Sequence, residues 1–392
     1  MNRYFKISII AAICVSAISC SAPHTNWSKK VEATLHDLIM QRADWALQQE
    51  PQTVTAFSSE RSAGGIHDFF SEGDFWWPNP DNPGGPYIQR DGQSNPDNFV
   101  AHRLVMIRLG DIIGALASAY IVTGDDKYVQ HAFRHLNAWF VNPATMMAPH
   151  LLYAQAIHGI TTGRDIGIID TVHLMEVAQG VIVMQDSETV DSKELAIIKQ
   201  WFADYLVWLT THQHGIDEMN RHNNHATCWV MQVASFATLT ENEEILEFCR
   251  RRYKDVLLPS QMAEDGSFPR EISRTKAYGY SLFNLDAMTA ICHILSTEED
   301  NLWEYTTETG LNIKKGIEFM YPFIKDKSLW ELPPDIAYWD EWPVAHPALL
   351  FGAIAFNNEA YFDLWKGLEH NPSVQEVVRN LPIRNPLIWL KR

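Results

Sequence analysis

Ten consecutive residues, Asn220 to Trp229, place several kinds of polar side chain directly ahead of an apolar helical pattern. One asparagine is enough to cap a helix, so the additional amide, imidazole and guanidinium groups exceed that structural need. At 3.6 residues per turn, His222, His225 and Trp229 share one helix face, with Asn224 about 100° from His225. An amide and an imidazole at the positive end of a helix dipole suit an anionic group such as a carboxylate. The alternative is a capped helix whose histidines are hydrogen-bonded in the core.

A second group of chemically active side chains lies between Arg270 and Tyr280. Arg270, Arg274 and Lys276 form a basic cluster in an acidic chain, just before Tyr278 and Tyr280 at the start of another helical pattern. A phenol can act as a general acid and, when deprotonated, as a general base if a neighbouring cation lowers its pKa. Taken singly, each of these basic residues can equally be an ordinary surface charge.

Aromatic side chains stand on a polar stretch near residue 80. Trp76 and Trp77 precede prolines, and the stretch continues to Arg90. Flat, rigidly held rings suit the apolar face of a sugar, or they form a hydrophobic plug that pins the loop. A later stretch supplies three further candidates for substrate contacts, namely His150, Tyr153 and Gln155. The alternative is that these side chains pack helices together.

Helical periodicity dominates the chain, so helices must position these side chains. Helices are expected at 31–49, 99–123, 127–140, 192–211, 226–239, 243–257 and 281–295. Gly124 closes one helix and Asp125 caps the next, and this pattern recurs at 355–360. About a dozen helices in hairpins, without a short strict repeat, predict an all-α fold: an incomplete (α/α)n toroid of about six to seven hairpins. The alternative is a solenoid of the tetratricopeptide type, but the sequence lacks the repeat signature of that fold.

Four long non-helical stretches separate these helices, at 57–98, 145–162, 261–279 and 328–347. Long loops in a compact domain usually carry function, so we expect these loops to roof an active-site cleft at one end of the toroid. No linker divides residues 20–392, which are expected to form a single toroid domain.

The first residues indicate a targeting segment. An apolar run at 7–18, preceded by two basic residues, is too short to span a bilayer. It ends at Ala17-Ile18-Ser19-Cys20, which resembles a bacterial lipoprotein cleavage site with Cys20 as the lipidated residue; an ordinary signal peptidase site nearby is the alternative. The sequence therefore predicts a signal peptide at 1–19 and an exported lipoprotein in the periplasm or outer membrane. The N-terminal lipid is its only expected membrane contact, and no later segment is expected to span a membrane.

Charge and cysteine content exclude several classes of protein. The chain has 31 Lys and Arg against 48 Asp and Glu, a net charge of −17. A general nucleic-acid binder would carry a basic face, so nucleic acid is not an expected partner. Cys228, Cys249 and Cys292 lie in apolar helical contexts and are expected to be buried thiols. No metal or other cofactor is expected, and a polyanionic substrate would need a locally basic cleft.

Several motifs occur in the order found in the alginate lyase superfamily. They are Trp76-Trp77-Pro78, Arg90-Asp91-Gly92-Gln93-Ser94-Asn95-Pro96, Leu151-Leu152-Tyr153-Ala154-Gln155-Ala156, Asn223-Asn224-His225 and the arginine-rich segment ending at Tyr280. From about Phe69 to the C-terminal helices, the chain resembles the helical-toroid polysaccharide lyases of families 5 and 38. Ala226-Thr227-Cys228-Trp229 follows the Asn-His pair where family 5 typically has Ser-Tyr-Trp, so the details resemble family 38 more closely.

The resemblance implies β-elimination on a uronic-acid polymer, in which the C5 proton is removed and the C4 oxygen expelled to leave a C4=C5 double bond. The carboxylate makes that proton weakly acidic, so the developing enolate must be stabilised. Asn224 and Arg274, with His225 near, are expected to neutralise it, and Arg270 is the alternative to Arg274. When H5 and O4 lie on one face of the sugar, Tyr280 is expected both to take H5 and to give a proton to O4. When H5 and O4 lie on opposite faces, His225 would be the base and Tyr280 the acid.

The implied substrate contacts and substrate follow from the same resemblance. Mannuronate and glucuronate place H5 and O4 on one side, whereas guluronate is inverted at C5. A reaction centred on Tyr280 therefore predicts activity on mannuronate-containing alginate, with glucuronan as a further candidate and polyguluronate as a poor substrate. The residues expected to bind the polymer are Trp76, Trp77, Arg90, His150, Tyr153, Gln155, His222, Arg270 and Tyr278.

Three other classes of protein remain open from the sequence. A helical-toroid glycoside hydrolase acting on uronic-acid-containing glycans would need two carboxyl groups, for which Asp335, Asp340 and Glu341 are the source. A non-catalytic glycan-binding lipoprotein would use the same tryptophans and basic cleft without turnover. A zinc enzyme is the third alternative. The sequence offers candidate ligands in His212, His214, His222 and His225, but it lacks the ligand spacing usual for zinc sites.

Overall fold

The computed structural model describes residues 26–390, so the expected signal peptide and Cys20 lie outside the described residues. Within this range the chain forms fifteen α-helices and two two-stranded sheets, which confirms the all-α class. The helices are α1 (Trp27–Ala46), α2 (Ala101–Thr123), α3 (Asp126–Phe140), α4 (Leu174–Met184), α5 (Ser192–Thr211), α6 (Gln213–Met219), α7 (Asn224–Leu239), α8 (Glu243–Arg252), α9 (Leu258–Gln261), α10 (Pro269–Ile272), α11 (Ala277–Leu295), α12 (Ile313–Lys325), α13 (Pro347–Phe356), α14 (Glu359–Lys366) and α15 (Gln375–Arg379).

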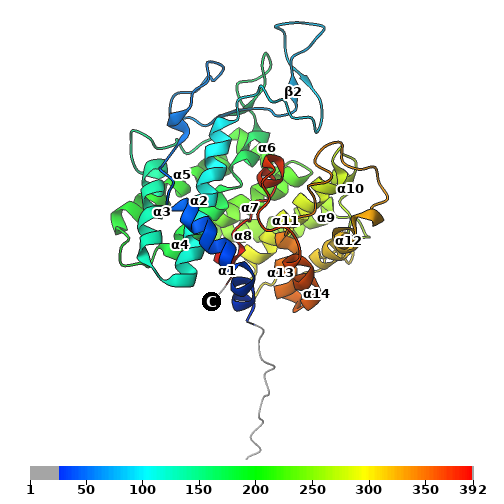
Figure 1. Cartoon of the computed structure of the whole chain (residues 1–392). Helices are drawn as coiled ribbons and strands as arrows, with labels where there is room; N and C mark the ends of the chain where they lie inside the picture. Colours follow the sequence, from blue (N-terminus) through cyan, green and yellow to red (C-terminus); the bar gives the residue numbers. More distant parts are fainter. Residues whose placement is uncertain (1–25, 391–392) are drawn as a thin grey trace, which may run out of the picture.

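The helices form an inner and an outer layer. Helices α2, α4, α7, α11 and α13 pack against one another in that order and make the inner layer, and α1, α3, α5, α8, α12 and α14 pack outside them (Figure 1). Burial follows this division: 17 of the 19 residues of α11 are buried, against 5 of 20 in α1. The buried residues of α1 recur at intervals of three or four, as expected for a helix that covers the core with one face.

Helix α2 corrects one expectation from the sequence. By length and composition it is apolar enough to cross a membrane, although no segment after the signal peptide was expected to be. In the fold, 72% of its apolar window is buried among the other helices. A helix that is apolar on all sides suits the inner layer, because neighbouring helices cover it all round.

The predicted turn chemistry is confirmed. Gly124 ends α2 in the left-handed region with φ of 67°, and the Asp125 side chain accepts a hydrogen bond from the Lys127 backbone at 3.0 Å. Asn357 and Asn358 perform the same two roles between α13 and α14. Glycine and asparagine tolerate positive φ, and aspartate and asparagine cap helices, so these boundaries follow from local sequence.

Several helix boundaries differ from the predicted ones, and the helix predicted at 31–49 is α1 at Trp27–Ala46. Helix α11 begins at Ala277, four residues before the predicted start, because the Asp335 carboxylate accepts hydrogen bonds from the Tyr278 and Gly279 backbone at 2.9 and 2.8 Å. Helix α8 ends at Arg252 and continues as a π-helical turn, Tyr253–Leu257. The free thiols of Cys228, Cys249 and Cys292 are buried, as predicted.

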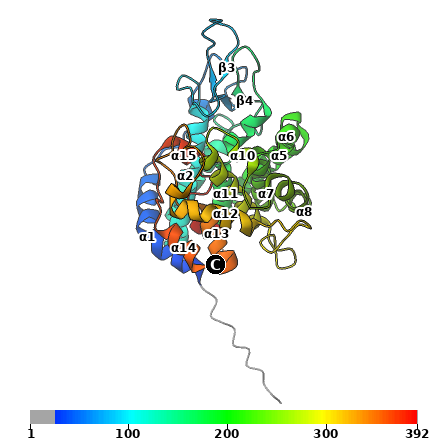
Figure 2. The ribbon, with the colours of Figure 1, turned by 90° about the vertical axis from the view of Figure 1, so that its right-hand side faces the viewer.

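The long loops gather at one end of the helices (Figures 1 and 2). Strand β1 (Phe70–Glu72) pairs in parallel with β4 (Tyr153–Ala156), which joins the first two loops to each other. Strands β2 (Trp76–Trp77) and β3 (Ile88–Gln89) form an antiparallel pair within the first loop. These short pairings give the loops a fixed shape above the inner helices.

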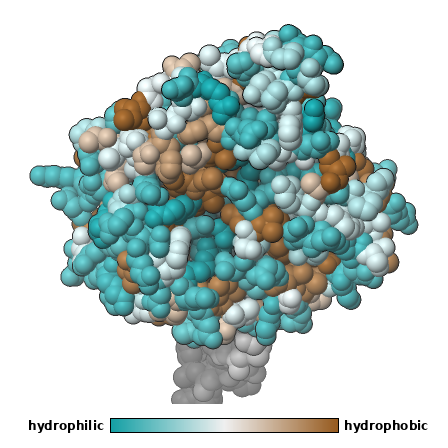
Figure 3. Space-filling model, turned by 45° about the horizontal axis from the view of Figure 1, so that its top comes forward, coloured by the Kyte–Doolittle hydropathy of each residue, from teal (hydrophilic) through white to brown (hydrophobic). Residues whose placement is uncertain are grey.

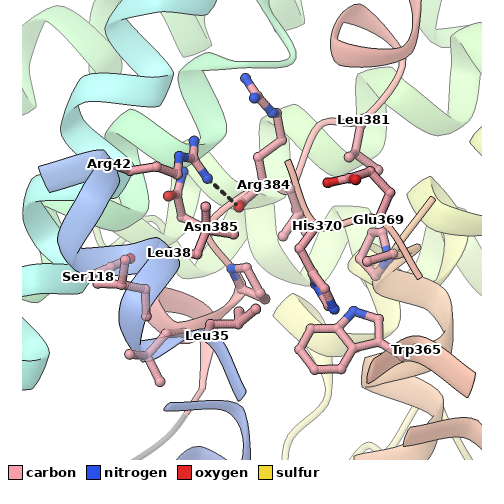
Figure 4. Close-up of a pocket in the computed structure, with 16 residues that line it drawn as sticks. Leu35, Leu38, Arg42, Ser118, Trp365, Glu369, His370, Leu381, Arg384 and Asn385 are labelled. Atoms are coloured by element: carbon pink, nitrogen blue, oxygen red, sulfur yellow. Dashed lines mark hydrogen bonds between the residues drawn. The ribbon is translucent and has the colours of Figure 1, made fainter. Parts of the chain in front are cut away.

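The C-terminal segment after α15 is bonded to helices from the first half of the chain. The Asn385 backbone and side chain donate to Glu176 on α4, and Arg384 pairs with Asp111 on α2. Arg42 on α1 donates to the Arg384 carbonyl at 3.0 Å (Figure 4). Arg42 and Arg384, which line the small cavity drawn in Figure 4, both pair with Asp111 and so hold the C-terminal segment against the helices.

Candidate active site

A cleft opens below the loops, at the end of the inner helices (Figure 3 brings this end forward). Three segments that are distant in the sequence bring the predicted catalytic residues and Trp76 together in its wall. The cleft is lined by Asp74, Phe75, Trp76, Gln89, Gln155, Arg164, Ile166, Ile169, Asn224, His225, Arg274, Tyr280, Phe283, Glu376, Arg379 and Asn380.

The start of α7 is capped from outside its own segment. Asn223 occupies the N-cap position, but its side chain makes no capping hydrogen bond. The buried Glu271 carboxylate on α10 accepts instead from the Asn224 backbone at 2.7 Å and from its amide nitrogen Nδ2 at 2.8 Å. An amide nitrogen carries two hydrogens, so the second N–H of Asn224 remains available to a ligand.

His225 is held by a second buried carboxylate. Its Nδ1 lies 2.7 Å from Glu218 Oε1 on α6, and Glu218 is fully buried. Burial raises the pKa of Glu218, while the neighbouring His225 opposes that rise. A carboxylate on one ring nitrogen fixes the orientation of an imidazole, so Nε2 is the nitrogen that remains for a ligand in the cleft.

Tyr280 presents a hydroxyl group that has no hydrogen-bond partner within residues 26–390, although it is buried. Arg274 lies over its ring at 4.6 Å, and the Lys276 ammonium lies 5.1 Å from the same ring. Burial nevertheless raises the pKa of Tyr280 well above its usual range, and Arg274 only partly opposes it. A neighbouring cation therefore lowers this pKa, as expected, but burial outweighs Arg274 and the net shift is upward.

Arg274 is tied to the loop above the cleft. Its Nη2 and Nε lie 2.6 and 3.1 Å from the two carboxylate oxygens of Asp91, and the Thr275 hydroxyl donates to the same carboxylate at 3.0 Å. The pair connects the loop after β3 to the segment that enters α11. Because Asp91 occupies one edge of the guanidinium, Nη1 remains for a ligand.

A buried ion network that the sequence did not predict forms part of the cleft wall. Asp74 lies 2.6 Å from Arg103 and 2.7 Å from Arg379, and Lys276 lies 2.5 Å from Glu376. Burial alone would raise the pKa of Asp74, but the two arginines lower it to about 2. These charges largely neutralise one another, so they shape the cleft without supplying a free acid.

Residues 53–330, more than half of the chain, match the family model described as alginate lyase. The chain belongs to the alginate lyase family. The similarity extends to solved structures: an alginate lyase from Bacteroides ovatus has a TM-score of 0.81 and 28% sequence identity, with 93% of this chain and 97% of that chain covered.

More distant alginate lyases share the fold. Alginate lyase A1-III from Sphingomonas species A1 has a TM-score of 0.55 at 15% identity, with 90% of this chain and 95% of that chain covered. A histidine-to-alanine variant of A1-III complexed with tetrasaccharide has a TM-score of 0.54 at 14% identity, with 90% and 94% covered. No curated protein sequence matches this chain. The fold is thus the helical toroid of these enzymes, and the protein is a polysaccharide lyase.

This alginate lyase family member places only part of the predicted substrate contacts in the cleft. Trp76 and Gln155 line it. Trp77 and Arg90 are not part of its lining and contact each other instead, with the guanidinium 5.0 Å from the ring. His150 and Tyr153 also lie outside the lining, where their rings contact each other. His150 packs near Trp208 and pairs with Asp68.

Three other predicted contacts of the lyase also lie outside the cleft lining. His222 and Arg270 are exposed, so Arg274 rather than Arg270 is the arginine that reaches the cleft. Tyr278 is fully buried, its hydroxyl donates to the Phe323 carbonyl at 3.1 Å, and its ring packs against two tryptophans. Residues two positions apart on a helix are rotated by about 200° about its axis, so Tyr278 and Tyr280 face different surroundings.

The lyase structure gives no support to the other catalytic readings. Asp335 caps α11, and Asp340 and Glu341 are exposed, so these carboxyl groups do not flank the cleft as a hydrolase would require. Across residues 26–390 no group of three or more His, Cys, Asp or Glu is placed to hold a metal ion. His225, one of the four proposed zinc ligands, is bonded to Glu218.

The residues that sequence analysis missed carried little local signal. Glu218 lies two helical turns before His225, but a break between α6 and α7 removes the regular spacing that would reveal the pair. Glu376 and Arg379 lie on the five-residue α15, which is too short for a clear period. Arg164 is a single arginine in a loop.

Proposed function

We propose that this lyase cleaves a uronic-acid polymer, namely mannuronate-containing alginate, and that it also accepts glucuronan. The products would carry a C4=C5 unsaturated uronic acid at the new end. One observation carries the proposal: the buried hydroxyl of Tyr280, which has no partner among residues 26–390, lies in the same cleft as Asn224, His225 and Arg274. Membership of the alginate lyase family supports the same reaction class.

The substrate carboxylate would be held by the donors that the protein leaves unused. These are the second N–H of Asn224 and the Nη1 group of Arg274, since Glu271 and Asp91 occupy their other donors. Charge on the carboxylate grows as the C5 proton leaves and an enolate forms. Donors fixed in advance stabilise that charge without reorganising, which is the usual source of a large rate increase.

Tyr280 would transfer both protons on the single face where mannuronate presents H5 and O4. Because burial keeps the phenol protonated, its proton must first leave. We assign that proton to Nε2 of His225, because Glu218 bonds Nδ1 and orients the ring. The phenolate then takes H5, the C5–H electrons form the C4=C5 bond, and the new phenol gives its proton to O4 as the C4–O bond breaks.

A substrate panel tests this function. Polymannuronate, polyguluronate, glucuronan and glycosaminoglycans would be incubated with the protein and followed by ultraviolet absorbance of the conjugated product. Absorbance should rise with polymannuronate and glucuronan and remain low with polyguluronate. New reducing ends without absorbance would indicate hydrolysis, and binding without either product would indicate a non-catalytic glycan-binding protein.

We also propose that the protein is an exported lipoprotein anchored through Cys20 in the periplasm or outer membrane. Helix α1 begins at the end of the toroid opposite the loops (Figure 1). An anchor at that end would leave the cleft facing away from the membrane and open to soluble polymer.

A further inference from the structure

Arg164 lines the cleft without a carboxylate partner. Its Nε donates to the Gln155 carbonyl and its Nη2 to the Gln155 side-chain oxygen, both at 3.0 Å. The other two arginines of the cleft, Arg274 and Arg379, are paired with carboxylates at 2.6 and 2.7 Å. Within residues 26–390, Arg164 has only neutral oxygens as partners, even though it is partly buried.

Its acidic neighbours are engaged elsewhere. Asp165, the next residue, accepts a hydrogen bond from Arg221 Nε at 2.6 Å. Burial lowers the pKa of Arg164 to about 10, which nearby Asp165 and Asp170 only partly oppose. A partly desolvated cation without a countercharge is unfavourable by itself, and an anionic ligand would remove that cost.

Gln155 is built to hold this guanidinium in place. Its amide nitrogen donates to Asp170 at 3.3 Å, so its amide oxygen faces Arg164. Asp170 is itself fixed by the Ser71 hydroxyl at 2.6 Å, and Ser71 also accepts from the Gln155 backbone at 2.8 Å. Gln155 has a φ of 48°, a left-handed conformation that costs about 1 kcal/mol or more for a residue with a Cβ. Such strain persists where surrounding bonds enforce a functional geometry.

The opposite side of the guanidinium is equally restricted. Arg164 lies 5.7 Å from the Trp76 ring, a cation–π contact. At Gly73, a Cβ would come within 2.7 Å of that ring and 2.9 Å of Arg164 Nη2, so only glycine lets both side chains lie there. Gln155 takes the Nε and Nη2 edge of the guanidinium. The fork formed by Nη1 and Nη2 therefore remains, and this fork matches a carboxylate with two parallel hydrogen bonds.

We propose that Arg164 is a second carboxylate-binding residue of the cleft, which holds the uronate next to the one that undergoes elimination, and that Gln155 is its positioning residue. The inference rests on the proposed function, because it assigns a subsite to the same polymer. It adds a requirement: two adjacent uronates must both carry a free carboxylate. Polymers that alternate a uronate with a neutral sugar, and polymers with esterified neighbours, would then be poor substrates.

Equilibrium binding in an inactive background tests this inference. In Tyr280→Phe protein, the affinity for a mannuronate tetrasaccharide would be measured by calorimetry with and without Arg164→Gln. Loss of a charge-assisted pair should weaken binding roughly 10- to 100-fold. The fully methyl-esterified tetrasaccharide should bind both proteins equally, because it offers no charged carboxylate. Arg251→Gln, at an exposed arginine on α8, is the matched control and should leave both affinities unchanged.

Other outcomes separate the possible failures. Equal affinity with and without Arg164, or an equal loss for the esterified tetrasaccharide, would overturn the inference while the lyase function stands. If Arg164→Gln does not fold, Arg164→Lys keeps the charge without the fork and should still weaken binding several-fold. Failure of the Tyr280→Phe parent to bind mannuronate, glucuronate and guluronate tetrasaccharides would instead overturn the proposed function, and this inference with it.

Discussion

Two tyrosines on α11 should respond in opposite ways when each loses only its hydroxyl group. Tyr280 has a buried hydroxyl without a partner in the described chain, whereas the Tyr278 hydroxyl donates to the Phe323 carbonyl at 3.1 Å. Replacement by phenylalanine keeps both rings and their packing. Tyr280→Phe therefore tests chemistry, and Tyr278→Phe is its matched control in the same helix.

The magnitudes follow from these two environments. An unsatisfied buried hydroxyl costs about 1–3 kcal/mol, so Tyr280→Phe should keep or increase stability. Tyr278→Phe loses a made hydrogen bond and should cost about 1 kcal/mol. With an unfolding entropy of about 2 cal/mol/K per residue, 1 kcal/mol corresponds to roughly 1 °C in Tm for a chain of this length. Turnover by Tyr280→Phe should fall ~10²–10⁴-fold, or about 3–5 kcal/mol of barrier, whereas Tyr278→Phe should retain it.

Product absorbance gives turnover, and thermal unfolding of the same samples gives stability. Near wild-type turnover by Tyr280→Phe would refute the catalytic assignment. A clear drop in its Tm would show that the hydroxyl has a structural partner. A comparable loss of turnover in Tyr278→Phe would show that the packing of α11, rather than a proton transfer, limits the reaction.

Three further predictions concern other residues. Asn224→Ala and Arg274→Ala should each lower kcat more than they raise KM, because the charge they neutralise grows in the transition state; an Arg274→Ala enzyme changed only in KM would make Arg274 a binding residue. Glu218→Gln should lower kcat roughly 10- to 100-fold with little change in KM, because His225 loses the carboxylate that orients its ring; an unchanged kcat would contradict this role. Cys20→Ala should abolish labelling by radioactive palmitate and release the protein from the membrane fraction, and retained label would rule out Cys20 as the lipidation site.

The helices were predictable because their signals are local. A period of 3.6 residues marks a buried face whatever that face contacts, and Gly124 and Asp125 set a helix end and start through their own backbone and side-chain preferences. The placement of Asn224 and His225 at the cleft was predictable for a related reason, since more polar groups than a cap requires open an apolar helix. The sequence motifs also pointed to the lyase class that the family match confirms.

The partners of these residues were decided only by the tertiary structure. Asn224 is bonded to Glu271, and Lys276 is bonded to Glu376, which lies 100 positions further along the chain; no local pattern specifies such pairs. The environment of Tyr280 also depended on the fold, because burial outweighs the adjacent cation and raises its pKa. Arg164 shows the same limit: that it has no carboxylate partner within residues 26–390 becomes visible only when all its neighbours are placed. Periodicity along the chain reports which residues are buried, whereas pairing and desolvation depend on distances between segments that the chain itself does not fix.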